Sequence, residues 1–163
     1  MITLTEQTIK TALINVSQRE RQAVTIATDL DSVDWDKLDY FGVRDRRIPS
    51  LGYVVVELDG APTGILVKEA DQKPRSRSQC SWCEDVTLPN DVVIFGARRT
   101  GAAGRNGNTV ATLVCANFEC SRNVRKLPPV AYLGYDVEEA RRARIRSLGE
   151  RSRDFVRDIR DNS

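Results

Sequence analysis

Two stretches of this sequence decide its fold: Cys-Ser-Trp-Cys at residues 80–83 and Cys-Ala-Asn-Phe-Glu-Cys at residues 115–120. They contain all 4 cysteines of the chain, with two residues between the members of the first pair and four between those of the second. In the cytoplasm, which we infer below for this chain, such close pairs are better explained by a metal ion than by disulfides. Four separate buried thiols, or a redox-active pair, are the alternative.

A set of four thiolates suits zinc, which prefers four tetrahedral ligands and binds thiolate sulfur at about 2.3 Å. The chain has no histidine, so a metal site has to be built from cysteine. We therefore expect one Zn²⁺ per chain. The expected ligands are Cys80, Cys83, Cys115 and Cys120. Because four thiolates leave no position open for water or substrate, this zinc is expected to be structural.

The segments between and after the cysteine pairs predict how the site is built. Residues 92–99 and 108–114 resemble strands, and the glycine-rich residues 101–107 join them into a hairpin with a mobile tip. Residues 121–126 should form a short helix, which Leu127-Pro128-Pro129 would end. A cysteine knuckle, a hairpin and a helix in this order make a treble clef. Cys120 would lie near the first helical turn, where unpaired backbone N–H groups can bond to sulfur.

The sequence before the first pair predicts a second hairpin. Residues 52–58 and 63–68 are β-rich runs, and Asp59-Gly60 between them is a strong turn signal. Residues 29–41 fit a short helix that holds aromatic side chains against a sheet, and residues 44–50 read as a surface loop. The polar, proline-containing segment 71–78 should be exposed and leads directly into Cys80.

Both ends of the chain show helical patterns. Thr3 with Glu6, and Ser17 with Glu20, have the spacing of capping boxes. Residues 24–26 are all β-branched and fit either a helical turn or a strand. From Asp136 a long amphipathic helix is expected, in which Gly149 marks a point where it can bend or break. Its apolar stripe consists of Ile145, Leu148, Phe155 and Ile159, with Ser152 between them.

These elements predict an α+β fold with short N-terminal helices, antiparallel β-hairpins, a treble-clef zinc finger and a long C-terminal helix. We divide the chain into an N-terminal helical segment at residues 1–40 and an α/β domain with the zinc finger at residues 41–135. The C-terminal amphipathic helix, residues 136–163, would be packed on this domain or extend from it.

Composition and charge limit the functional class. Apolar residues make up 40% and charged residues 29%, so the chain should fold. Its apolar runs are far shorter than the roughly 20 residues that cross a bilayer, and its N-terminus lacks the features of a secretory signal, so we expect a cytoplasmic protein without membrane contact. Residues 1–40 carry 4 basic and 7 acidic side chains, a net charge of −3, whereas the remainder is at +5. Such a basic surface can attract RNA or an acidic protein, or it can simply be well solvated.

Four features of the sequence occur together in a known family: the spacing of the cysteine pairs, residues 35–42 (Trp-Asp-Lys-Leu-Asp-Tyr-Phe-Gly), Arg44-Asp45 and the strand around Tyr53. On these features the chain resembles the FBP or FusB-type elongation factor G-binding proteins, over roughly residues 15–135. This resemblance implies a C-terminal α/β domain with a four-cysteine treble clef that binds elongation factor G and promotes its release from the ribosome. Resistance proteins of this group carry a large N-terminal helical bundle, which is largely missing here, so fusidic acid resistance does not follow.

A partner surface is expected around the zinc finger. Trp82 and Phe118 could face the partner, or they could pack within the hairpin. A basic rim would suit an anionic partner, and it would consist of Arg98, Arg99, Arg105, Arg122, Arg125 and Lys126. Elongation factor G is the first hypothesis, and a zinc-finger module that binds RNA or the ribosome is the alternative. An enzyme with a small-molecule substrate is not expected, because histidine, a Walker loop and a nucleophile elbow are all missing.

Overall fold

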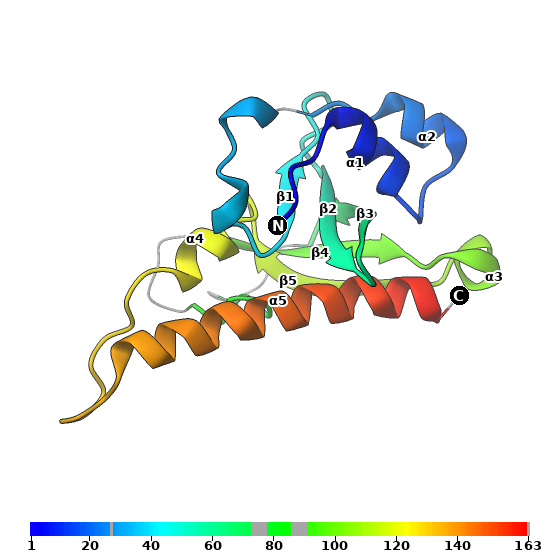
Figure 1. Ribbon diagram of the computed structural model, residues 1–163. Helices are drawn as coiled ribbons and strands as arrows, with labels where there is room; N and C mark the ends of the chain where they lie inside the picture. Colours follow the sequence, from blue (N-terminus) through cyan, green and yellow to red (C-terminus); the bar gives the residue numbers. More distant parts are fainter. Residues whose placement is uncertain (27, 73–77, 86–90, 163) are drawn as a thin grey trace.

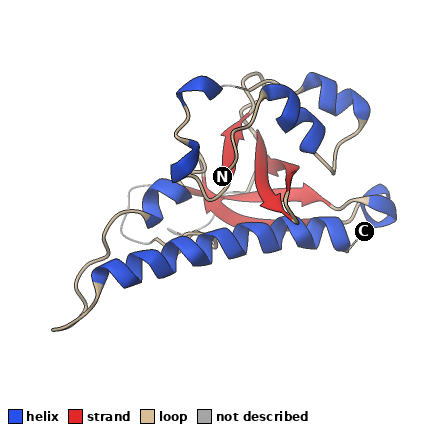
Figure 2. Cartoon of the chain, in the orientation of Figure 1, coloured by secondary structure: helices blue, strands red, loops and turns tan. Residues whose placement is uncertain are grey.

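The computed structural model of the chain describes residues 1–26, 28–72, 78–85 and 91–162 (Figure 1). Within these residues a five-stranded antiparallel sheet has the order β1-β2-β3-β4-β5, which is also the order along the chain. The strands are β1 (Phe41–Arg44), β2 (Leu51–Leu58), β3 (Ala61–Glu69), β4 (Val92–Arg98) and β5 (Thr109–Cys115). Helices cover the sheet on two sides (Figure 2). The predicted α+β class is confirmed.

The hairpin of β2 and β3 forms where the sequence predicted it. Asp59 and Gly60 adopt positive φ angles of 53° and 77°, as a two-residue type I′ turn requires, and Leu58 pairs with Ala61 across it. Residues 53–56 of β2 are buried on both faces of the sheet, because β2 lies between two helical layers. This double burial explains their continuous apolar run.

Helix α5 (Val137–Asp161) lies along one face of the sheet (Figure 1). Asp136 caps its N-terminus by accepting bonds from two backbone N–H groups. The predicted stripe is the buried face of the helix, with Leu148, Ser152 and Ile159 all 0% exposed. The helix is not interrupted at Gly149, since it continues through this residue to Asp161. A helical glycine costs only about 1 kcal/mol, which burial of the residues around it outweighs.

The opposite face carries the N-terminal layer, with α1 (Glu6–Ala12) and α2 (Gln18–Ala23) (Figure 1). Thr5 caps α1 through a 3.1 Å bond from the N–H of Thr8, so the predicted cap at Thr3 is wrong by two residues. The capping box of Ser17 and Glu20 is confirmed. This layer forms a core of its own with the sheet, and its members are Leu4, Ile9, Ala12, Leu13, Val24, Phe41, Val43, Tyr53 and Val55.

The segment that leads into the sheet differs from prediction. Two 3₁₀ turns, η1 (Leu30–Ser32) and η2 (Trp35–Lys37), take the place of one short helix, and β1 follows where no strand was predicted. The loop after β1 is not wholly at the surface, because Asp45 is only 4% exposed. Its carboxylate accepts bonds from Tyr53 and Thr25. Ile26 forms an antiparallel bridge with Asp45, which favours the strand alternative for residues 24–26.

The tip of the β4–β5 hairpin is a helix, α3 (Gly101–Arg105), rather than the predicted mobile loop. A Cβ at Gly104 would lie 1.8 Å from the carbonyl oxygen of Arg99, so the turn requires glycine. The hydroxyl of Thr100 donates to carbonyl groups in the last turn of α5 at 3.0 and 3.2 Å. These bonds tie the tip to the end of α5, which the glycine content alone does not reveal.

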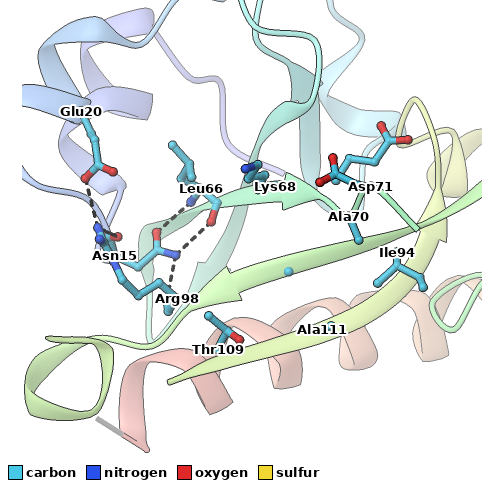
Figure 3. A pocket seen from close by; sticks show the side chains of 12 residues that line it. Asn15, Glu20, Leu66, Lys68, Ala70, Asp71, Ile94, Arg98, Thr109 and Ala111 are labelled. Carbon is cyan, nitrogen blue, oxygen red and sulfur yellow. Dashed lines mark hydrogen bonds and ion pairs between the residues drawn. The ribbon is translucent and has the colours of Figure 1, made fainter. Parts of the chain in front are cut away.

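Strands β3 and β4 pair at only two positions, Lys68 with Gly96 and Glu69 with Phe95. Beyond them the side chain of Asn15 fills the gap (Figure 3). Its amide nitrogen donates to the carbonyl groups of Leu66 and Arg98 at 2.9 and 3.0 Å, and its amide oxygen accepts from the N–H of Leu66 at 2.8 Å. One side chain of the N-terminal layer therefore joins two strands that do not pair there.

Candidate metal centre

The four cysteines come together at one end of the β4–β5 hairpin. Cys80 and Cys83 flank a tight turn, Cys115 is the last residue of β5, and Cys120 is the first residue of α4 (Cys120–Val124). All four are free and at most 3% exposed. Their Sγ atoms lie within 4.8 Å of one another. The predicted order of knuckle, hairpin and helix is confirmed.

The sulfur positions fit a zinc ion. The Sγ atoms of Cys80 and Cys120 are 3.6 Å apart, and those of Cys83 and Cys115 are 3.7 Å apart. A regular tetrahedron with metal–sulfur distances of about 2.3 Å has edges of about 3.8 Å. The donor set is sulfur only, which suits zinc better than the hard cations that prefer oxygen. The geometry and chemistry therefore agree with a closed, structural site.

The thiols of this cluster do not titrate independently. Hydrogen bonds from Cys115, Cys120 and Cys83 lower the pKa of Cys80 far below the usual range of a thiol. Hydrogen bonds with Cys115 and Cys120 lower the pKa of Cys83 to about 7, whereas bonds with Cys115 and Cys80 raise the pKa of Cys120. The close approach of the four sulfur atoms thus favours the thiolate form at Cys80 and Cys83. A cation that displaces the remaining protons would bind more tightly as the pH rises.

Two strained turns aim the sulfur atoms inward. In the first pair, the N–H of Cys83 donates to Cys80 Sγ at 3.5 Å, and Glu84 adopts a positive φ of 52°. In the second, the N–H of Phe118 donates to the carbonyl of Cys115 at 2.9 Å, and Phe118 has a φ of 59°. The bond from N–H to sulfur that was expected at the start of α4 lies instead within the knuckle.

Asn123 is a residue of the site that sequence analysis missed. Its side chain is 1% exposed, and its Nδ2 lies 3.5 Å from the Sγ of Cys115 and 3.9 Å from that of Cys83. Its Oδ1 has no hydrogen-bond partner among the described residues. The amide therefore presents its donor end to two ligands, where it stabilises negative charge on sulfur. The only signal in the sequence is its place three residues after Cys120, on the same face of a helix.

The two aromatic residues of the cysteine stretches are buried. Trp82 is 3% exposed and meets Tyr40 edge to face, with ring centroids 4.9 Å apart. Phe118 is 7% exposed and stacks on Phe95 at 5.0 Å. A Cβ on Gly42 would lie 2.6 Å from Phe118, so that strand residue has to be small. Packing is therefore the role of Trp82 and Phe118, and the expectation that they face a partner is wrong.

The expected basic rim divides into two groups. Arg98, Arg99 and Arg105 belong to the hairpin tip, whereas Arg122, Arg125 and Lys126 belong to α4 and the residue pair after it. Strands β4 and β5, of 7 residues each, separate these groups by about 23 Å at about 3.3 Å per residue. The prediction that these six cations form a single basic rim is therefore wrong.

Half of these cations are already paired. Arg98 forms an ion pair with Glu20 at 3.0 Å, Arg99 with Asp158 at 2.9 Å, and Arg125 with Asp39. The other three are exposed and form no ion pair within the described part of the chain, and they are Arg105, Arg122 and Lys126.

A knuckle, a hairpin and a short helix that bring four thiols to tetrahedral spacing define the chain as a treble-clef zinc finger. The chain belongs to the family described as FBP C-terminal treble-clef zinc-finger, whose model matches residues 8–159. The match extends beyond the cysteine region to α1 and to most of α5, so the family covers both helical layers. No curated protein and no solved structure matches this chain. Among the described helices, none has the length and apolar character needed to cross a membrane.

Proposed function

We propose that this chain is a binding module for elongation factor G and promotes release of the factor from the ribosome. The observation that supports this proposal is the family match, which spans residues 8–159 and thus the whole fold rather than the cysteines alone. The resemblance of the chain to the FBP or FusB-type elongation factor G-binding proteins supplies the partner. The compartment of such a protein would be the cytoplasm.

The metal centre supports a role in binding rather than in catalysis. Zinc, when bound by four thiolates, supplies a cross-link and no open coordination position. Here Cys80 and Cys83 hold the knuckle, Cys115 holds the end of β5, and Cys120 holds the start of α4. Fixing these segments gives a rigid surface, which lowers the entropy cost of binding.

Ribosomal RNA is the alternative partner, and ion pairs within the chain argue against this alternative. The arginines of α5 would provide a phosphate-binding face only if they were free. Instead, Arg141 pairs with Glu138 at 2.5 Å, and Arg142 and Arg146 both pair with Glu139, at 2.9 and 2.8 Å. Neutralised cations attract a polyanion weakly, so a protein partner is favoured.

A binding experiment with purified components tests this proposal. The full chain, immobilised with its zinc, should bind purified elongation factor G, and binding should persist after RNase treatment. In a ribosome sedimentation assay, added chain should reduce the amount of factor that pellets with ribosomes. Absence of binding to the factor would contradict the proposal. Capture that RNase abolishes would favour the RNA alternative.

A further inference from the structure

Residues 127–135, which we call the apolar finger, connect α4 to α5 and project from one end of the molecule (Figure 1, yellow to orange). The finger holds four of the six large apolar side chains that are exposed among the described residues. Leu127 is 56% exposed, Val130 70%, Tyr132 66% and Leu133 103%. Single exposed apolar residues are ordinary, but a contiguous group on one projection marks an interaction surface.

The finger has a defined shape. Its tip is a turn in which the N–H of Tyr135 donates to the carbonyl of Tyr132 at 3.1 Å. Gly134 has a φ of 86°, which this turn position requires, and the rings of Tyr132 and Tyr135 meet edge to face with centroids 5.2 Å apart. Leu133 therefore stands at the apex of a closed turn. An apolar apex held in this way loses less entropy on binding than a free segment.

The root of the finger is attached to the metal centre. Cys120 and Asn123 belong to α4, and the N–H of Lys126 donates to the carbonyl of Asn123 at 3.2 Å just before the finger begins. Pro128 and Pro129 line a hollow of about 410 Å³ that they share with Cys83 and with residues of α5. A metal ion that fixes α4 would therefore also fix the direction of the finger.

Charges around the finger restrict its partner. On the α4 side, Arg122 and Lys126 are exposed and unpaired within the described residues. On the other side lie Asp136, Glu138 and Glu139 at the start of α5. Glu138 and Glu139 are themselves paired with arginines of α5, so the uncompensated charge beside the finger is the pair of cations on the α4 side. A protein whose apolar cleft has an acidic rim on that side would complement this arrangement.

We propose that the apolar finger inserts Val130, Tyr132 and Leu133 into an apolar cleft of a protein partner, whose acidic rim meets Arg122 and Lys126. The proposal rests on the function proposed above, in that the partner used to test it is elongation factor G. Apolar contacts at the tip would supply most of the affinity, and the two cations would act mainly on the rate of association.

The first test removes the apolar tip. We expect the double variant Val130→Ser, Leu133→Ser to bind purified elongation factor G about tenfold more weakly or worse, because central apolar anchors dominate interface energetics. Ile48→Ser is the matched control, since Ile48 is also apolar and 52% exposed but lies in the β1–β2 loop. The control should bind like the parent. Zinc content and melting temperature should be unchanged in both variants, because these side chains are already exposed.

The second test reverses the charge beside the root. Arg122→Glu, Lys126→Glu should slow association with the factor at low salt, with the difference from the parent shrinking as salt increases. Arg105→Glu is the control, because Arg105 is exposed and unpaired in the described structure but lies at the opposite end of the hairpin. It should leave the association rate unchanged.

The outcomes separate the two proposals. If the parent binds the factor and the tip variant binds it equally well, the finger proposal is overturned and the proposed function stands. If the parent does not bind the factor, the proposed function fails and the partner assigned to the finger fails with it. If the tip residues are instead required for binding ribosomal RNA or vesicles of anionic phospholipid, a protein cleft as the partner of the finger is overturned.

Discussion

The cores on the two faces of the sheet differ in the kind of side chain that stabilises them. On the α5 face, the core includes all four cysteines together with Trp82 and Phe118, so a cluster of thiols occupies space that apolar side chains fill elsewhere. On the N-terminal face, the core contains no cysteine and depends on apolar side chains such as Ile9 and Leu13, both 0% exposed. Burying ionised sulfur is unfavourable unless a cation compensates it, whereas burying leucine is favourable by itself. The comparison therefore predicts that the core on the α5 face requires a metal ion for its stability, whereas the core on the N-terminal face does not.

Metal removal should give the largest effect and should act mainly on the α5 face. Apparent binding energies of structural zinc are about 10–16 kcal/mol, which matches or exceeds the roughly 5–15 kcal/mol stability of a domain. We expect one zinc per chain by metal analysis, and a large fall in melting temperature after chelation or in Cys120→Ser. Amide exchange should increase first in α4 and α5. Less than half an equivalent of zinc, with no change of melting on chelation, would contradict this.

Cavity substitutions provide a matched comparison of the two faces. Leu13→Ala on the N-terminal face and Leu148→Ala on the α5 face each remove a leucine that is 0% exposed. Each should lower the free energy of unfolding by about 2–5 kcal/mol. Only Leu148→Ala, whose side chain belongs to the same core as the cysteines, should also weaken zinc binding in competition with a chelator. Equal zinc affinity in the two variants would contradict the prediction that only the α5 face is coupled to the metal.

Asp45 should make the stability of the N-terminal face depend on pH in the acid range. Burial raises its pKa, but hydrogen bonds from Tyr53 and from the N–H groups of Ile48 and Arg47 outweigh burial and lower it. Its contribution is therefore present above the pKa of an unfolded aspartate, about 3.9, and is lost as the pH falls through the lower folded-state value.

The variant Asp45→Asn tests this contribution. It should lower the free energy of unfolding at pH 7 by about 2 kcal/mol, since bonds to a charged acceptor are lost. When urea unfolding is measured at successively lower pH, the difference in unfolding free energy between variant and parent should vanish. At the lowest pH, protonation of Asp45 has removed the same contribution from the parent. A difference that stays constant over the whole acid range would show that the carboxylate charge is not responsible.

The smallest effect on the stability of the fold is expected for Asn123, which acts on the metal through its ligands. Asn123→Ala removes the N–H donor near Cys115 and Cys83, and outer partners of this kind typically change metal affinity by about 10–100-fold. We expect weaker zinc binding and faster alkylation of the thiols, with the fold retained at saturating zinc. Asn162→Ala, at the exposed end of α5, is the control. Unchanged zinc affinity in Asn123→Ala would limit Asn123 to packing.

Local signals predicted the parts of the fold that depend on neighbouring residues. The β2–β3 hairpin followed from Asp59-Gly60, α5 from its 3.6-residue stripe, and the cysteine cluster from two short spacings. Strand β1 was missed, because four residues are too few to show a period. Helix α3 was missed because glycine usually indicates a turn, and here its docking on α5 decides the conformation.

The clustered cysteines, the class of fold and the residues of the long helix could be predicted from short sequence patterns, because neighbouring residues encode those features. Which polar groups are buried and which cations are free depends instead on contacts between distant segments. Asn15 reaches Arg98 across 83 positions, and Arg125 pairs with Asp39 across 86. The predicted basic rim failed for the same reason. Charge is a property of a residue, but whether that charge is available depends on partners that folding brings from elsewhere in the chain.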